Sequence, residues 1–596
     1  MLASPVIKKS DLVTYQILAD GSPIKDTYNV KSIVVQKKVN RISSCEIHIV
    51  DGNAATEDFP ISDSSTFLPG VKIEIKLGYD GTNQSVFKGV VLRQNLKVKK
   101  MGGPILEVIC KDESIKMTSG RKNAYFKQQK DSDIISSVIG NYGGLQADIS
   151  ATSNQHPEVV QYYSTDWDFI LSRAETNGMV VMTDAGKVSV KNPDDETDAV
   201  VAVTYGQDLL EFDATLDAQY QFKSIKSNAW DLKNQKIVNG QSTISDYGQG
   251  NVSNSSLSSV MGVSDFGLQS TVPLEEGDLN AWAKAQATKS KYSKIRGTLS
   301  FQGNGDTVPG KLIDINGVGA RFTGKAIVSA VEHRFANGNW ITEAEIGMTP
   351  EWFSDRVPMQ ASLASGLLPG IQGLQNGTVK QIDQDPDGQF RVLVDVPIIK
   401  EGGDGIWARL SNFYATNEAG SFFYPEVGDE VILGFLNEDP RFPIILGSLY
   451  NSNSKVAPYT PDEQNSKKAI VTKNKLKLEF DDENKIITIT TPGENKMIWS
   501  DQDQNIMIQD QNENSIELSS SGITIKSASN MNLQAAEAIS IKAGTSVTVE
   551  AGESISLQAS SITAQAEMEA QIEGGMTTTV SGGEEVSING AMVMIN

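Results

Sequence analysis

The sequence predicts a mainly β protein with an α+β N-terminal region, a small closed β-barrel and a C-terminal β-helix in which three chains are intertwined. Three observations support this prediction. Alternating apolar and polar residues fill much of residues 1–365, five evenly spaced strand-like segments fill residues 371–450, and an eight-residue repeat runs to the C-terminus. With 596 residues, the chain is about four times the ~150 residues of an ordinary domain, so it needs several cores or one very elongated structure.

The N-terminal region, residues 1–365, reads as short strands with a few helices between them. Alternation of apolar and polar side chains predicts strands over 71–79, 85–92, 105–110 and 179–190. In the last of these segments, Asp184, Ala185 and Gly186 are typical of a hairpin turn. Because strands dominate, the region is of a sheet-rich α+β class.

Three helices are expected in the same region. They cover residues 131–143, 164–178 and 278–295. Asp131 is predicted to be the N-cap of the first helix, and Ser164 or Thr165 that of the second. Apolar residues recur at helical spacing in the first two helices, so each is expected to bury one face.

Residues 371–450 are predicted to form a separate small barrel. A poorly periodic stretch with Pro and Gly, residues 356–370, places a boundary near residue 365. The five segments that follow are separated by the turns DPDG (385–388) and PEVGDE (425–430). Five short antiparallel strands in about 80 residues suit a closed barrel of the OB type. A polar connector with two prolines, residues 451–469, comes next.

Within this barrel, side-chain size and type suggest which positions are buried. Trp407, Phe435 and Leu446 are expected in the core. Gly428 and Gly447 are expected at turns or close approaches. Direct contact of these residues with a partner is the alternative.

The C-terminal region, residues 470–596, has a composition unlike that of a globular core. After Trp499 there is no aromatic residue, proline, histidine, cysteine or arginine. Apolar residues two apart recur every eight residues, with one single-residue slip: Met531/Leu533, Ile539/Ile541, Val547/Val549, Ile555/Leu557, Ile562/Ala564, Ala570/Ile572, Thr578/Val580 and Val586/Ile588. A fixed repeat of this kind predicts a solenoid.

An eight-residue repeat supplies one short strand and a bend, which is too little chain to close a coil. Other copies must therefore supply the remaining walls, and three chains make the simplest prism. Its core is predicted to hold Ile539, Ile541, Val547, Val549, Ile555, Leu557, Val586 and Ile588. Residues 470–596 carry 7 lysines against 18 acidic residues, which is half of the total net charge of −22 and is expected to coat the outside.

Composition excludes several classes of function. Lys and Arg number 52 and Asp and Glu 74, a balance that repels phosphate backbones, so no nucleic acid partner is expected. The cysteines Cys45 and Cys110 and the histidines His48, His156 and His333 are too few for a zinc site of usual spacing, and CxxC is absent. No metal or other cofactor is predicted.

Candidate catalytic residues have structural explanations. Asp166 and Asp168 flank Trp167, and glycan cleavage needs two acids and an aromatic platform for the sugar. Helix capping and the helix dipole, however, explain two aspartates near a helix N-terminus. His333 lies in an alternating run with no nucleophile elbow nearby. The acidic cluster at 481–483 is read as a solvated turn and not as a cation site. No catalytic residue is therefore predicted.

Signals for export are not evident in the sequence. The N-terminus lacks a basic start followed by an apolar run, and no uncharged apolar stretch of 18 residues occurs. The chain is expected to be made in the cytoplasm without a signal peptide, so any later exit must use another machine.

Three segments resemble a known family. Residues 407–451 are similar to the OB-fold of VgrG proteins and phage spike proteins, with the elements WAR, PEVGDEV, GF, DP and P-x-x-LGSLYN in order. Residues 162–181 and 308–335 resemble the hub, or late-control D, domain of the same proteins. This resemblance implies a hub over 1–365 with two related β-barrel-like lobes, an OB barrel over 371–450, a linker over 451–469 and a trimeric β-helix over 470–596.

The resemblance further implies a noncatalytic central spike and tube adaptor of a contractile injection machine. Its implied partners are two further copies in a homotrimer, a hexameric inner-tube protein, baseplate proteins, a PAAR-type tip protein, effectors and, transiently, the target membrane. The tip protein is expected on Met592, Val593, Met594, Ile595 and Asn596. The machine would deliver the chain outside the cell or into a target cell.

Two other classes remain open, a tail-spike hydrolase of cell wall or polysaccharide and a trimeric adhesin. Some phage members carry a lysozyme domain between the barrel and the C-terminal β-helix, residues 470–596, which is called the shaft below. The interval here is about 20 residues, which is too short to fold an enzyme. An effector domain after the shaft is not expected either. The sequence leaves open whether the machine is a type VI secretion system, an extracellular injection particle or a phage tail.

Overall fold

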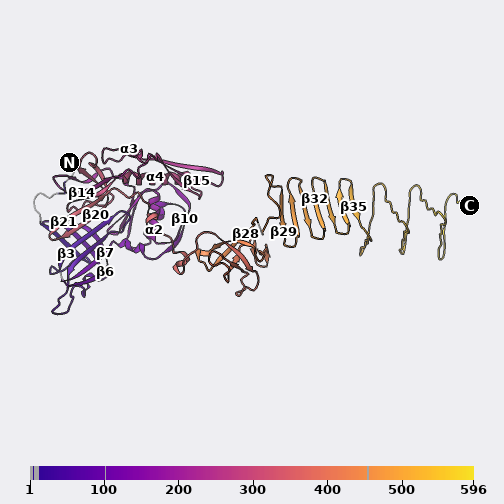
Figure 1. The fold of residues 1–596 in the computed structure, drawn as a ribbon, viewed down its shortest axis with the longest axis horizontal. Coiled ribbons are helices and arrows are strands. Elements are labelled where there is room, and N and C mark those ends of the chain that lie inside the picture. The colour runs from indigo at the N-terminus through magenta and orange to yellow at the C-terminus, as the bar shows by residue number, and fades with distance from the viewer. Residues whose placement is uncertain (1–3, 6–11, 101–102, 453–454, 596) are drawn as a thin grey trace. The chain divides into compact units, whose positions relative to one another are not determined.

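The structure is a computed structural model that describes residues 4–5, 12–100, 103–452 and 455–595 (Figure 1). The chain divides into two compact units, Met1–Ser448 and Leu449–Asn596. The first unit contains the helices, a large sheet and a closed barrel, and the second contains a single narrow sheet followed by a long segment without strands. In the parts of the chain that are described, no helix combines the length and apolar character needed to cross a membrane.

A 13-stranded sheet forms the framework of the first unit, in the order β14-β18-β21-β20-β3-β4-β7-β6-β5-β1-β2, with β13 and β19 attached beside β20. Its first half consists of β1 (Val13–Ala19), β2 (Ser22–Pro23), β3 (Asn29–Lys38), β4 (Ser44–Val50), β5 (Lys72–Tyr79), β6 (Thr82–Lys99) and β7 (Gly103–Lys111). Its second half consists of β13 (Ala199–Thr204), β14 (Leu209–Leu216), β18 (Ile295–Gln302), β19 (Leu312–Asn316), β20 (Gly324–Ala336) and β21 (Asn339–Ile346). The halves join where β20 pairs antiparallel with β3.

Smaller elements pack around this sheet. The helices are α1 (Asp131–Gly140), α2 (Asp166–Thr176), α3 (Asn254–Ser258), α4 (Glu276–Ser293) and α5 (Phe353–Arg356), and short 3-10 turns occur at 65–67, 113–118, 193–195, 363–366 and 436–438. Two three-stranded sheets and one ribbon complete the region: β8 (Lys122–Lys130), β9 (Gln146–Ile149), β10 (Gln155–Ser164), β11 (Val180–Asp184), β12 (Lys187–Lys191), β15 (Ser224–Asp231), β16 (Lys236–Thr243) and β17 (Asp265–Ser270). The strands and the three longer helices predicted from the sequence are confirmed.

Local details of these elements differ in one respect from the predictions. Thr165 is the N-cap of α2, where its hydroxyl accepts from the Asp168 amide at 3.0 Å. The β11–β12 turn places Ala185 and Gly186 at positive φ, as a two-residue hairpin requires. The cap prediction for Asp131 is wrong. Lys130 is the N-cap of α1, and the Asp131 carboxylate is drawn instead into a buried ion pair with Arg173.

The five predicted barrel strands are β22 (Gln375–Gln381), β23 (Val392–Asp395), β24 (Ile406–Leu410), β27 (Glu430–Phe435) and β28 (Pro443–Leu449). They close a barrel in the order β22-β23-β24-β28-β27, with a short hairpin, β25 (Ala415–Thr416) and β26 (Ala419–Gly420), inserted after β24. One pairing departs from the expectation of an all-antiparallel barrel. β24 and β28 are parallel, because the chain crosses the barrel between them to close it.

The barrel core is built from small and β-branched side chains, including Val379, Val392, Val394, Ala408, Val431, Leu433 and Ile445. The prediction that Trp407 and Leu446 are core residues is wrong. Strand side chains alternate between faces, so the buried Ala408 and Ile445 turn their neighbours Trp407 and Leu446 outward. Phe435 is only half-buried against the core.

The predictions for the two barrel glycines, Gly428 and Gly447, have different outcomes. Gly428 adopts φ 86° in the predicted turn. Gly447 lies within β28, and a Cβ there would meet no atom within 4 Å, so neither a turn nor a close approach requires this glycine.

The second unit begins with a seven-stranded antiparallel meander of five-residue strands. They are β29 (Lys467–Val471), β30 (Lys477–Asp481), β31 (Ile486–Thr490), β32 (Lys496–Ser500), β33 (Asn505–Gln509), β34 (Ser515–Ser519) and β35 (Gly522–Lys526). No strand or helix is present among the described residues 527–595. The strand expected in each octad is therefore not formed in the single chain, because each octad has no partner strand within its own chain.

Candidate functional site

The main candidate site is the apolar face of the β29–β35 meander. Residues that lie directly opposite one another on adjacent strands form rows across the sheet. One row is Phe480, Ile487, Trp499, Ile506, Leu518 and Ile523, and the neighbouring row on the same face is Ile470, Leu478, Ile489, Met497, Ile508, Ile516 and Ile525. The isoleucines of both rows remain 38 to 71% exposed. This face needs a cover that the meander itself does not supply.

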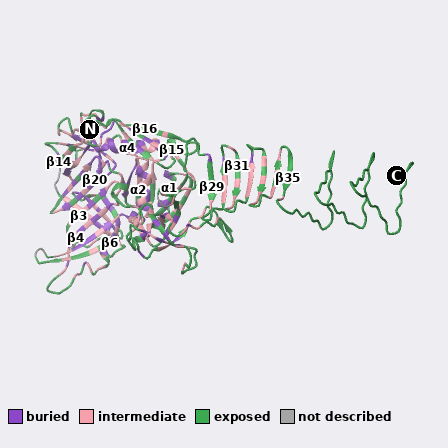
Figure 2. Cartoon of the chain, turned by 45° about the vertical axis from the view of Figure 1, so that its right-hand side comes forward, coloured by how far each residue is buried: buried purple, intermediate pink, exposed green. Residues whose placement is uncertain are grey.

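The octad segment carries the same uncovered pattern further. The eight side chains that the sequence predicts in a trimer core, Ile539, Ile541, Val547, Val549, Ile555, Leu557, Val586 and Ile588, are 48 to 74% exposed in the single chain. Figure 2 shows this segment as exposed throughout, whereas buried residues are concentrated in the first unit. The structure brings none of these eight residues together within one chain.

The predicted tip residues are also uncovered. Met592 and Met594 are 78% and 83% exposed, and Val593 and Ile595 are 49% and 88% exposed. Asn596 lies outside the described residues. These apolar side chains form no core within the single chain.

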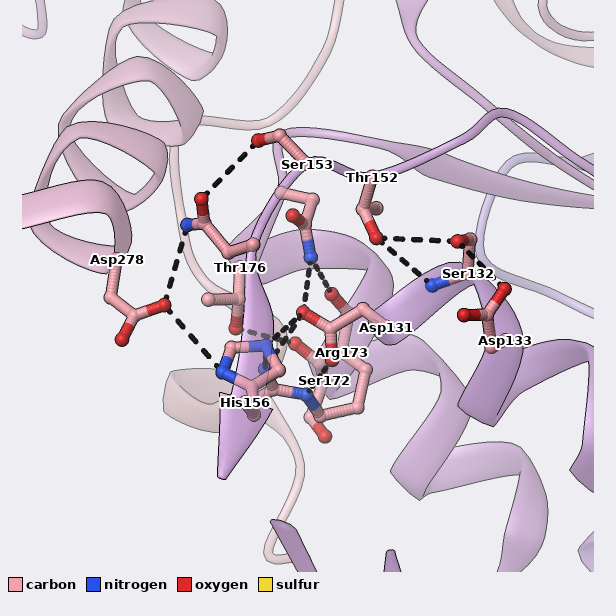
Figure 3. Close-up of polar contacts among 12 residues, drawn as sticks. Asp131, Ser132, Asp133, Thr152, Ser153, His156, Ser172, Arg173, Thr176 and Asp278 are labelled. Atoms are coloured by element: carbon pink, nitrogen blue, oxygen red, sulfur yellow. Dashed lines mark hydrogen bonds and ion pairs between the residues drawn. The ribbon is translucent and has the colours of Figure 1, made fainter. Parts of the chain in front are cut away.

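A polar network in the first unit places a histidine, His156, between the carboxylates of Asp131 and Asp278, an arrangement that active sites also use (Figure 3). Arg173 on α2 holds Asp131 on α1 through two bonds, at 2.6 and 2.9 Å. His156 on β10 places Nε2 3.0 Å from Asp131 Oδ2 and Nδ1 3.6 Å from Asp278 Oδ1 on α4. Burial raises the pKa of Asp131, but the Arg173 guanidinium outweighs burial and lowers it overall.

This network ties elements together rather than preparing a reaction. Both ring nitrogens of His156 lie beside carboxylate oxygens, and Nε2 also lies 3.3 Å from Arg173 Nη2, so charged groups of the network surround the ring. The residues lie on α1, β10, α2 and α4, and the network links these four elements at the edge of a cleft.

Asp166, one of the two carboxylates that flank Trp167, is part of a second polar network. The buried Asp166 accepts from Tyr142 Oη at 2.6 Å, Lys122 Nζ at 2.7 Å and Gln161 Nε2 at 2.8 Å. Burial raises the pKa of Asp166, and these donors lower it below its ordinary value. Trp167 is packed in the core around α1 and α2, so it offers no platform for a sugar.

His333 is enclosed in the sheet. It is 1% exposed, and its Nδ1 lies 3.0 Å from Thr342 Oγ1. Burial and then the Lys37 ammonium lower the pKa of His333 to about 3, so the ring is neutral at physiological pH. A buried neutral histidine with a hydroxyl partner is a core residue.

Within the described ranges, Glu46, His48 and Glu107 form the one group whose ligand atoms could surround a cation. Glu107 already accepts from Lys97 Nζ at 2.6 Å and Asn95 Nδ2 at 2.7 Å. Burial raises the pKa of Glu107, but these donors hold it at about 2. Because Glu107 is already bound by an ammonium and an amide, the group fits an ion-pair network better than a metal site.

The predicted acidic turn at 481–483 has partners of its own. Asp481 pairs with Lys467 at 2.5 Å and accepts from Asn484, and Asp482 pairs with Lys468. These contacts join the turn to β29. The solvated-turn prediction is wrong for Asp481, which is 6% exposed, whereas Asp482 lies at the surface.

Sequence reasoning missed a group of exposed aromatic residues on the barrel. Phe390, Phe413, Tyr414, Phe422 and Phe423 are 78, 90, 56, 80 and 59% exposed. The available signal was the pair of dipeptides FY and FF on either side of a polar turn, in a stretch where a barrel loop would ordinarily be polar.

Taken together, a closed OB barrel, a hub-like sheet and a narrow uncovered β-meander define the spike class of injection and phage-baseplate proteins. Residues 9–337 match the family described as the Alg8 N-terminal domain. Residues 375–450 match the type VI secretion system/phage-baseplate injector OB domain, and residues 486–551 match the phage baseplate V C-terminal trimerisation domain. The chain belongs to the Alg8 N-terminal domain family and is a VgrG-type spike protein.

Individual relatives show how far the similarity reaches. The type VI secretion system spike protein VgrG1b of Pseudomonas aeruginosa is 24% identical over 371 residues, which cover 56% of this chain and 47% of the relative. The spike protein VgrG3 of Vibrio cholerae is 39% identical over 66 residues, or 11% of this chain and 6% of the relative. The chain thus spans about half the length of VgrG1b and a small part of VgrG3.

Solved structures were compared as well. A 43 kDa tail protein of prophage MuSo2 from Shewanella oneidensis aligns with a TM-score of 0.43 and 10% identity, covering 57% of this chain and 98% of that one. The E. coli c3393 protein, a component of the type VI secretion system, aligns with a TM-score of 0.38 and 12% identity, covering 73% of this chain and 100% of that one.

Proposed function

We propose that the chain forms the noncatalytic, homotrimeric central spike and tube adaptor of a contractile injection machine. The observation that carries this proposal is the uncovered apolar face of β29–β35, which overlaps the match to a trimerisation domain over residues 486–551. A single-layer sheet with one apolar face is unstable alone in water, and two further copies of the same face supply the cover.

The parts of the chain take different roles in this proposal. Residues 1–365 are the hub, 371–450 the OB barrel, 451–469 a linker and 470–596 the trimeric β-helix. The prism core begins with the two rows of the meander and continues through Ile539, Ile541, Val547, Val549, Ile555, Leu557, Val586 and Ile588. Ladder hydrogen bonds and a continuous apolar core make such a prism resistant to compression.

The proposed partners follow from symmetry and from the exposed C-terminus. Each hub sheet has two halves, so three hubs would offer six similar surfaces to a hexameric inner-tube protein, with baseplate proteins around them. Met592, Val593, Met594, Ile595 and Asn596 of three chains would form the platform for a PAAR-type tip protein, which could carry effectors. The assembled particle would leave the cell or enter a target cell, and the spike would contact the target membrane as it passes through.

Imaging of contractile particles from the native cell tests this function. A tag on the chain should be found at one end of the inner tube, and particles whose only copy is Val547→Asp should lack the spike. The matched control is Thr548→Asp, on the outward side of the same octad, which should leave the particles intact. Tagged protein distributed along the sheath, or absent from the particles, would contradict the proposal.

The hydrolase alternative has a direct test of its own. Purified protein should produce no cleared zone in gels that contain peptidoglycan or acidic glycans. A cleared zone that survives Asp166→Asn and His156→Asn would place an active site elsewhere on the chain, and a zone lost with either substitution would assign catalysis to the polar network.

A further inference from the structure

The OB barrel carries five exposed aromatic side chains, called here the aromatic patch: Phe390, Phe413, Tyr414, Phe422 and Phe423. All five side chains are more than half exposed, and Phe413 and Phe422 are 90% and 80% exposed. Isolated exposed aromatics are ordinary, but a cluster of this size on one small barrel marks an interaction surface.

Backbone contacts link the segments that carry the patch, and one ring contact joins Phe422 to Tyr424. The β25–β26 hairpin pairs Ala415 with Gly420, and the Ser421 amide donates to the Tyr414 carbonyl at 2.8 Å, so the arms that carry Tyr414 and Phe422 run side by side. The rings of Phe422 and Tyr424 are 5.0 Å apart, and Tyr424 Oη donates to the Phe390 carbonyl at 2.8 Å. The patch is thus a preformed surface, which lowers the entropy lost on binding.

Inside the barrel there is no room for these rings. The core is already filled by Val379, Val392, Val394, Ala408, Val431, Leu433 and Ile445. The hairpin adds a two-stranded extension outside the closed ring of strands, and its one acidic side chain, Glu418, lies at the turn. The flanks are neutral and aromatic, a composition that fits a protein surface and not a nucleic acid or an anionic membrane.

We propose that the aromatic patch packs against the barrel of a neighbouring copy of this chain, which makes the OB barrels a second subunit interface. This inference rests on the proposed trimer. Only residues 450–466 separate the end of β28 from the start of β29, so trimerised strands tether three barrels within about 60 Å of chain. Tethers of this length give effective concentrations in the millimolar range, at which a weak aromatic contact is occupied.

The size of the patch is appropriate for such an auxiliary interface. Fully burying an aromatic side chain covers about 150–250 Å². Five partly buried rings cover several hundred Å² per barrel, below the ~800 Å² per partner of a stand-alone interface. The contact would therefore form when the shaft has assembled and would not hold the copies together without it.

Cysteine labelling tests this contact, because Cys45 and Cys110 are both buried and contribute no background. Phe422→Cys and the control Tyr205→Cys, whose parent side chain is 70% exposed on the hub, are treated with a maleimide in the purified full-length trimer. Both rates are measured on the folded trimer, without denaturant. We expect Phe422→Cys to react at least about tenfold more slowly than Tyr205→Cys, because reaction requires the interface to open.

A double variant provides an independent measurement. Phe413→Ser with Phe422→Ser should keep the trimeric mass but lower the temperature at which the trimer dissociates. Tyr125→Ser with Tyr205→Ser, two exposed hub positions, should leave that temperature unchanged.

The outcomes are distinguishable. Equal labelling rates of Phe422→Cys and Tyr205→Cys in a trimer would overturn the barrel interface. The patch would then be left to bind a different protein, and the proposed function would stand. Equal dissociation temperatures of the two double variants would overturn it as well. A chain that is monomeric before any substitution would overturn the proposed function and this interface together.

Discussion

The two units of the chain solve the problem of burying apolar side chains in different ways. In Met1–Ser448, clusters of fully buried residues such as Ile33, Ile47, Phe301 and Val431 lie between elements of the same chain. In Leu449–Asn596, the isoleucines of the two apolar rows are 38 to 71% exposed, and Ile539, Ile541, Ile555 and Ile588 of the octads are 56 to 72% exposed. The apolar cores of the first unit are complete within one chain, whereas the second unit leaves an apolar face uncovered, which the proposed trimer would cover.

This difference separates two kinds of stability. The hub and barrel should stay folded when the shaft, residues 470–596, dissociates, because their apolar cores lie within one chain. The shaft should depend on concentration, because folding and association are the same event. Substitutions in the two units should therefore affect different measurements.

The largest effect is expected from a charge in the octad core. Val547→Asp would place three carboxylates near the axis of the prism, and each costs several kcal/mol unless it is protonated. We expect loss of the trimer by light scattering while the near-ultraviolet circular dichroism of the hub is retained. Thr548→Asp, one residue along and on the outward face, should be mild, and equal damage from both would refute the assigned register.

The next effect is confined to the hub. Glu175 and Lys289 form a buried ion pair at 2.5 Å, and Glu175 also accepts from the Phe353 amide at 2.8 Å. Glu175→Ala leaves the ammonium buried without its partner, which typically costs about 3–5 kcal/mol. Chemical denaturation should show this loss for the hub while the trimeric mass is unchanged.

The matched control replaces both members of that pair. Glu175→Leu with Lys289→Met removes the buried charges together and should recover much of the lost stability. A fall in trimeric mass with Glu175→Ala would instead show that the two units are energetically coupled.

A smaller effect should appear when the pH is lowered. Burial lowers the pKa of His333 from 6.5 to about 3. Above pH 6.5 the ring is neutral in both states; below it the unfolded chain takes up a proton that the folded hub does not, so the free energy of unfolding decreases. Between pH 6.5 and 5 this amounts to about 2 kcal/mol. His333→Asn should give a shallower pH dependence of hub unfolding, and an unchanged slope would contradict the role of His333.

The barrel gives a still smaller effect. Trp407 is half-buried on the outer face, with the Arg391 guanidinium 6.0 Å from its ring centroid. Trp407→Ala should cost about 1–2 kcal/mol, from lost partial burial and a cation–π contact. A loss near 4 kcal/mol in thermal unfolding would restore Trp407 to the core.

The smallest effect on assembly is expected at the C-terminus. Deleting residues 590–596 removes the exposed side chains from Met592 onward but spares every octad pair. The trimer should persist by light scattering, while binding of the cognate tip protein should be lost in a pull-down. Retained binding would place the tip site elsewhere.

Much of the fold could be predicted because local signals and tertiary structure agree. Thr165 carries a cap signal that α2 uses, and the alternation in 71–79 is that of β5. Asp131 carries the same kind of signal, but its carboxylate pairs with Arg173 instead. Arg173 lies 42 residues away in the sequence, so local patterns do not predict this contact. Long-range ion pairs override local propensity.

The barrel and the shaft show two further limits. The size of Trp407 predicts a core position, but the structure buries its neighbour Ala408 instead. Successive strand side chains point to opposite faces, so a shift of one residue reverses which side chain is buried. In the shaft the octads from Met531 were recognised, whereas the paired rows from Ile470 to Ile525 were not, because their strands are spaced unevenly by turns of different length. The polar hairpin between the flanking aromatics concealed the barrel patch.

The central claim is that the second unit is completed by two further copies of the chain. Light scattering on purified full-length protein, repeated over a dilution series, measures this most directly. We expect a mass of about three times 64.4 kDa, which should persist on dilution until the shaft unfolds. A stable 64.4 kDa monomer with the same β-type circular dichroism would contradict it.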